Sequence, residues 1–208
     1  MSNVKVFRLA YADFFSKEPE KMVDYYTTTM GYRITEEKDG ITYLSNGVDH
    51  HNVVITPSNQ KGIRSYGYQL DGKLSLEEVQ EQLKSRGIES TLVVDGKPGI
   101  SRFLELNDPA GNIVELFTEM DQPVVGFGTT GILPLKLGHI AFYAKNFNET
   151  IKFYREALGF AFTDKIGEDF CNFLTCNYEH HVLNIVASDE TRLHHIAYRS
   201  FLSLAISD

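Results

Sequence analysis

The stretch Phe7–Phe14, FRLAYADF, has a second copy at Leu135–Phe142, LKLGHIAF. Both stretches have the length and the apolar content of a β-strand with one buried face. A strand that occurs twice indicates a repeated supersecondary unit, so each later element is expected in two copies.

A helix is expected after each strand, and this helix repeats as well. Apolar residues recur at helical spacing in two segments, and a glycine follows where a left-handed cap would end the helix. These are segment 22–30 with Gly31 and segment 151–158 with Gly159. A third match joins DHHNVVI at 49–55 to EHHVLNI at 179–185. The repeat therefore covers a whole βαβββ module.

A second unit lies between these two copies. Its elements are a strand at 64–70, a helix at 75–86 and strands at 92–94, 102–106 and 112–117. Ser75 and Glu78 predict a capping box for the helix, and the turn NDPAGN at 107–112 predicts a tight hairpin. A fourth unit begins at 191–198. The sequence thus predicts an α+β fold in which repeated βαβββ modules pair into curved open sheets.

The segment 121–134 is rich in glycine and proline, which predicts a linker. We expect an N-terminal domain at 1–122, a linker at 123–134 and a C-terminal domain at 135–208. The second unit extends from 64 to 120, so a matching fourth unit would run past residue 208. We therefore expect the C-terminal domain to be incomplete, with one module and the first strand of the next.

Composition excludes several classes of protein. Hydrophobic residues make up 42% of the 208 residues, enough for packed cores, and the net charge of −8 disfavours nucleic acid as a partner. No apolar run approaches the roughly 20 residues of a membrane helix. The N-terminus lacks a secretory pattern, and the only cysteines, Cys171 and Cys176, are expected to be buried apolar residues, so we expect a cytoplasmic protein.

Two histidines occupy first-strand positions that correspond under the repeat. His139 and His195 are therefore predicted as a pair of metal ligands, because imidazole commonly binds first-row divalent metals. The matching first-half positions are assigned to Tyr11 and Tyr66, which predicts a first half without metal. His194 should face the opposite side of its strand.

The doublet His180-His181 opens a strand beside this pair. We favour His181 as the inward residue, where a neutral imidazole could accept and return a proton. A structural role stays open, because His50-His51 recurs in the half without the other histidines. Glu115 is expected to make a local hydrogen bond or to face solvent.

The motifs resemble type I extradiol ring-cleavage dioxygenases, such as catechol 2,3-dioxygenase, of the vicinal oxygen chelate superfamily. They are LGHI at 137–140, KFYREALGF at 152–160, NYEHH at 177–181 and LHHI at 193–196. The resemblance implies a metal-free first domain and a second domain in which His139, His195 and a glutamate bind Fe(II), or in some members Mn(II). It implies that His181 assists proton transfer to and from the bound catechol and dioxygen.

The glutamate and an active-site tyrosine of the family have no counterpart here, and we expect them beyond residue 208. The resemblance implies extradiol (meta) cleavage of a catecholic ring with dioxygen, in a homo-oligomer. With two ligands we expect weak iron binding, and the activity of this chain as written stays open. We favour part of a longer enzyme over a short protein completed by a partner.

Two other functions on the same fold stay open, since fold alone does not separate them. One is a metal-free small-molecule-binding protein of the antibiotic-sequestering kind. The other is a glyoxalase-like or epimerase-like lyase or isomerase, which would favour Zn(II), Ni(II) or Co(II) and take up no oxygen. The histidines confined to the second half, together with His181, favour the dioxygenase. The residues do not determine which catechol is cleaved.

Overall fold

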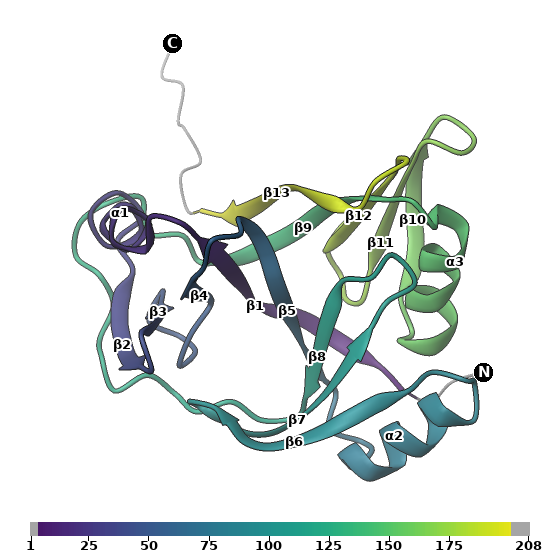
Figure 1. Ribbon diagram of the computed structural model, residues 1–208, viewed down its shortest axis with the longest axis horizontal. Coiled ribbons are helices and arrows are strands. Elements are labelled where there is room, and N and C mark those ends of the chain that lie inside the picture. The colour runs from purple at the N-terminus through teal and green to yellow at the C-terminus, as the bar shows by residue number, and fades with distance from the viewer. Residues whose placement is uncertain (1–3, 201–208) are drawn as a thin grey trace.

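The computed structural model of the protein describes residues 4–200. The first part of the chain forms an eight-stranded sheet that curls into a half-barrel, in the order β2-β3-β4-β1-β5-β8-β7-β6 (Figure 1). Its strands are β1 (Val6–Ser16), β2 (Arg33–Lys38), β3 (Ile41–Ser45), β4 (Val53–Pro57), β5 (Gly62–Leu70), β6 (Ser90–Lys97), β7 (Ile100–Asn107) and β8 (Ile113–Phe117).

The second part forms a five-stranded sheet in the order β10-β11-β12-β9-β13. Its strands are β9 (Lys136–Ala144), β10 (Ala161–Ile166), β11 (Cys171–Thr175), β12 (Leu183–Ala187) and β13 (Arg192–Arg199). In both sheets the first strand of the repeat pairs parallel with one neighbour and antiparallel with the other: β1 with β4 and β5, and β9 with β12 and β13. The predicted α+β fold of repeated modules in curved sheets is confirmed.

The repeated helices end as predicted but contain a feature that the sequence pattern did not indicate. Each begins as an α-helix and continues into a π-helical turn that buries a tyrosine, Tyr26 or Tyr154. The elements are α1 (Pro19–Asp24) with η1 (Tyr25–Thr29), and α3 (Phe147–Lys152) with η2 (Phe153–Ala157). Gly31 and Gly159 follow with φ of 79° and 76°. The helix of the second unit, α2 (Leu76–Lys84), has the predicted capping box.

One hydrophobic core joins the two sheets. Tyr66 of β5 stacks on Phe142 of β9 with ring centroids 6.2 Å apart. The hydroxyls of Tyr66 and Tyr154 both hydrogen-bond the buried carboxyl of Asp108, at 3.1 and 2.9 Å, in the predicted hairpin turn. Asn112 donates its backbone N–H to Asp108 as well, at 2.8 Å. Core packing and this buried polar cluster therefore hold the sheets together.

Two further expectations can be compared with the described residues. Cys171 and Cys176 are free and buried, as predicted. Between β8 and β9 the chain has neither helix nor strand, where we expected the linker, although the two-domain division itself stays a prediction. Among residues 4–200, no helix is both long enough and apolar enough to cross a membrane.

Candidate metal centre

Strands β9 and β13 bring His139 and His195 together. In the antiparallel register His139 lies opposite Ala197, and His195 lies opposite Ala141. The two Nε2 atoms are 2.8 Å apart. Ile140, which follows His139 in β9, lies in the shared core, and Ile196, which follows His195 in β13, packs against it. The histidines therefore lie on the face of the sheet that is turned away from that core.

His181 lies just before β12 and joins this pair. Its ring centroid is 4.3 Å from that of His139, and it packs against Phe173 at 4.9 Å. Its Nδ1 is 2.9 Å from Nδ1 of the more exposed His180, whose Nε2 is 3.8 Å from a carboxylate oxygen of Asp164. The structure thus brings together the three histidines singled out in the sequence; their roles stay predictions.

The three imidazoles are uncharged at neutral pH. Burial first, and then repulsion from the protonated forms of His181 and His195, lower the pKa of His139 to about 4. Burial is also the main cause that lowers the pKa of His181 and of His195. Each ring therefore keeps a nitrogen lone pair that can bind a metal or accept a proton.

A groove of about 520 Å³ opens beside His139 and His181. Its lining residues are Gly138, His139, Tyr178, Glu179, His180, His181, Ala197, Tyr198 and Arg199. Tyr198 reaches into the protein, where its hydroxyl lies 2.9 Å from that of Tyr26 in η1. The first half of the chain therefore contacts the strand that carries His195.

An ion-pair cluster at the rim of the groove was not found by sequence reasoning. Glu179 accepts from Lys136 at 2.5 Å and from Arg199 at 3.4 Å. Glu179, Lys136 and Arg199 match the first-half residues Asp49, Arg8 and Gln69, in that order. The repeat could therefore have indicated this cluster.

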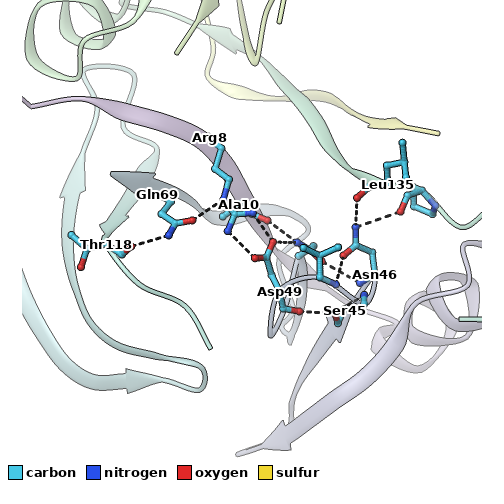
Figure 2. A network of polar contacts seen from close by, with 12 residues as sticks. Arg8, Ala10, Ser45, Asn46, Asp49, Gln69, Thr118 and Leu135 are labelled. Carbon is cyan, nitrogen blue, oxygen red and sulfur yellow. Dashed lines mark hydrogen bonds and ion pairs between the residues drawn. The ribbon is translucent and has the colours of Figure 1, made fainter. Parts of the chain in front are cut away.

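The first-half counterpart of this cluster is more fully bonded, as Figure 2 shows. Arg8 forms a two-point ion pair with Asp49 at 2.7 Å and donates to Gln69, which donates to the carbonyl of Thr118. Asn46 then donates to the carbonyl of Leu135 at 2.7 Å, immediately before β9. This network ties the first sheet to the strand that carries His139.

The donor set fits part of a metal centre. Two nitrogens bound side by side at about 2.0–2.1 Å on one octahedral metal would be about 2.8–3.0 Å apart, close to the observed separation; the same distance also suits a hydrogen bond between the rings. Across residues 4–200, no group of three or more His, Cys, Asp or Glu side chains is arranged to hold a metal ion. The glutamate that the resemblance implies is expected beyond residue 208 and so outside the described residues.

Strand register corrects one equivalence. His195 lies opposite Ala141, and in the first sheet the matching residue Asp13 lies opposite Ser65. The residue that matches His195 is therefore Ser65, and the predicted match with Tyr66 was wrong by one residue. A shift of one residue along a strand moves to the other face, and the Tyr66 side chain lies on the core face. The match of Tyr11 with His139 agrees with the register.

Two other expectations concern Glu115 and His194. Glu115 is buried and accepts hydrogen bonds from Tyr11, Ser65 and Lys97, so the hydrogen-bonded alternative is confirmed and the solvent-facing one is wrong. His194 is skipped by the strand pairing and packs on Tyr143 at 5.0 Å. Simple strand alternation, on which its opposite orientation was predicted, does not apply at this bulge.

The comparison of sequences now identifies the family. The sequence pattern of the Glyoxalase/Bleomycin resistance protein/Dioxygenase superfamily matches residues 8–116 and 136–208. The chain belongs to this superfamily. The first matched segment covers most of the eight-stranded sheet, and the second begins with β9, which agrees with the repeat.

Curated relatives of this superfamily member include proteins named as dioxygenases. A 3-methylcatechol 2,3-dioxygenase from Pseudomonas putida is 30% identical over an aligned length of 151, and the alignment covers 62% of this chain and 50% of the relative. The chain spans about half the length of the curated relatives it matches.

Solved structures of the superfamily share the fold. The 2,3-dioxygenase LapB from Pseudomonas sp. KL28 has a TM-score of 0.84 at 24% identity, over 95% of this chain and 76% of that chain. A Mn(II)-bound glyoxalase from Novosphingobium aromaticivorans has a TM-score of 0.82 at 23% identity, over 93% and 65%. One fold therefore carries both kinds of protein.

Proposed function

We propose that this chain provides two metal ligands, His139 and His195, of an extradiol dioxygenase that cleaves catecholic rings with Fe(II), or Mn(II), and dioxygen. The observation that carries the proposal is the 2.8 Å approach of the two Nε2 atoms on a face that also presents His181. The similarity to a 3-methylcatechol 2,3-dioxygenase supports catechols as the substrate class.

The proposal assigns the third ligand to a glutamate beyond residue 208. Two imidazoles and one carboxylate form a facial triad, which leaves positions open for substrate and dioxygen. Because the chain spans about half of its curated relatives, the complete activity belongs to the proposal rather than to the described residues.

The bound metal would supply a Lewis acid for the catechol oxygens and electrons for dioxygen chemistry. His181 would manage a proton at Nε2. If its Nδ1–H donates to Nδ1 of His180, as their 2.9 Å separation allows, Nε2 carries a lone pair that can accept a proton from a catechol hydroxyl. The contact between the two Nδ1 atoms would then orient His181, while Nε2 of His180 lies 3.8 Å from a carboxylate oxygen of Asp164. Such base catalysis contributes about 10²–10⁴-fold to rate.

A glyoxalase-like lyase or isomerase is the second candidate, and its support is the shared fold with the Mn(II)-bound glyoxalase. Both candidates would use His139 and His195. They differ in the need for oxygen, and His181 next to the ligand pair favours the dioxygenase.

The test is anaerobic loading with Fe(II), followed by oxygen uptake and absorbance of the yellow ring-cleavage product with catechol, 3-methylcatechol and biphenyl-2,3-diol. A version extended to about 250–300 residues, where the gene encodes one, is assayed in parallel. We expect stoichiometric oxygen consumption in at least the extended form. No iron binding and no oxygen uptake in either form would contradict the proposal.

We also propose the division into domains 1–122 and 135–208 with linker 123–134, a cytoplasmic location and a homo-oligomer. Sedimentation velocity at several protein concentrations measures the oligomeric state. A monomer at all concentrations would contradict the last of these.

A further inference from the structure

A buried lysine lies in the first sheet, outside the candidate metal centre. Lys97 ends β6 and is 5% exposed. Its ammonium is 2.7 Å from a carboxylate oxygen of Glu115, 3.2 Å from the hydroxyl of Tyr11 and 3.8 Å from a carboxylate oxygen of Asp13. It also lies 4.4 Å from the centre of the Tyr11 ring. A cation with this little exposure requires such partners to be stable.

The partners of Lys97 occupy the first-half positions that correspond to the candidate ligands. Tyr11 matches His139, and Ser65 matches His195 in the strand register. Tyr11 and Ser65 both donate to Glu115, which lies on β8 opposite Gly67. The side chains at these positions therefore converge on one carboxylate, and the lysine neutralises it.

We propose that this face of the first sheet is a monovalent cation site whose resident cation is the ammonium of Lys97, at the place that corresponds to the candidate metal centre of the second sheet. The inference goes beyond the proposed function, because the site in the first sheet would hold an ammonium whether or not the second sheet binds a metal. In a variant that lacks the lysine side chain, the site would take a primary alkylammonium ion.

The charges around Lys97 balance, which supports this assignment. Asp13 is fully buried and pairs with Arg64 at 2.7 Å, so that two carboxylates meet two cations. His51 lies beside them, with its ring 4.7 Å from that of Tyr11 and with no hydrogen-bond partner for its buried Nε2 among the described residues. Because Lys97 already supplies the positive charge, His51 can stay neutral.

Packing closes the site against water. A second set of buried residues surrounds Tyr11 on this face: Ala10, Tyr43, Val54, Ile100, Phe103 and Phe117. Gly67 lets the Tyr11 ring approach the backbone, since a Cβ there would lie 2.1 Å from a ring carbon. In such surroundings the loss of the ammonium would leave Glu115 as an uncompensated buried charge.

The test deletes the ammonium and returns it as a free molecule. Lys97→Ala removes a propylammonium-sized group, and we expect its thermal midpoint to fall by roughly 10 °C. Addition of n-propylammonium chloride should raise the midpoint again in part, and this increase should saturate as the salt concentration rises. Tetramethylammonium chloride at the same concentrations, which cannot donate a hydrogen bond, should restore none of it. Equal effects of the two salts would overturn the proposal.

Two controls keep the result interpretable. Lys165→Ala removes an exposed lysine that pairs with Glu168 at 3.1 Å, and n-propylammonium should not change its midpoint beyond the wild-type response. If Lys97→Ala does not fold, Lys97→Met is compared with Lys97→Met/Glu115→Gln. The double variant should melt higher, because it no longer buries an unpaired charge. A double variant no more stable than the single one would overturn the proposal.

Discussion

The Nε2 atoms of His139 and His195 lie 2.8 Å apart, although 56 positions separate them in the sequence. The antiparallel pairing of β9 and β13 produces this approach, with an alanine opposite each histidine. Because both imidazoles are held neutral, each keeps a lone pair that can bind a metal, and His139 lies at the edge of the groove. Substitutions at this pair, at His181 and in the core should therefore affect metal binding, proton transfer and stability separately.

Replacing the proposed proton acceptor should reduce turnover and leave metal binding intact. For His181→Asn we expect oxygen uptake with catechol to fall about 100-fold or more, because the base is lost while both ligands remain. Metal affinity should change less than about threefold. The neighbouring variant His180→Asn should lose clearly less activity, since His180 would only orient its neighbour. Equal losses in the two variants would contradict the role of His181.

The buried histidine of the first half should make stability depend on pH. Burial lowers the pKa of His51 well below its usual value, and the charge of Lys97 adds to this effect. Near pH 6.5 and below, the unfolded chain therefore takes up a proton at His51 that the folded chain does not. The free energy of unfolding should be highest above about pH 6.5 and fall with decreasing pH, by up to about 1.4 kcal/mol per unit from this residue.

Urea unfolding of wild type and His51→Gln between pH 5 and 7.5 checks this contribution. The difference in the pH dependence of the free energy of unfolding between the two proteins gives the contribution of His51, because the histidines of the candidate centre are present in both. The variant should show the shallower slope, and parallel curves would refute the prediction.

The hydroxyl of Tyr154 should contribute measurably to the contact between the sheets. Tyr154→Phe removes a hydrogen bond of 2.9 Å to Asp108 and one of 2.5 Å to Tyr66, both buried. We expect the free energy of unfolding to fall by about 1–3 kcal/mol. Tyr178→Phe, at a side chain that is 86% exposed, should change it by less than about 0.5 kcal/mol. Equal effects would show that the buried cluster adds no stability.

The repeat made much of the fold and of the candidate centre predictable from the sequence. A strand, a helix with its glycine cap and a histidine doublet recur at nearly constant spacing, so that His139 and His195 could be matched by their place in the repeat alone. Turn and cap chemistry is local, and for this reason the hairpin with Asp108 and the capping box at Ser75 were also predicted.

What the sequence did not reveal depends on contacts between distant residues. The correspondence of His195 with Ser65 follows from strand register, and an error of one residue moves a side chain to the other face of the sheet. Lys97 meets Tyr11 from 86 positions away, and no local pattern marks it as buried. The π turns follow the same apolar spacing as ordinary helical turns, so periodicity did not distinguish them.

The most direct test of the central claim is the binding of Mn(II) by this chain, measured from the electron paramagnetic resonance signal of the free ion. We expect saturable binding of one ion per chain, and a dissociation constant at least about tenfold higher for His139→Ala and for His195→Ala. His50→Ala, in the first half, should bind as the wild type does. If the wild type and both ligand variants bind Mn(II) equally, or none of them binds it, then His139 and His195 do not form a metal centre in this chain.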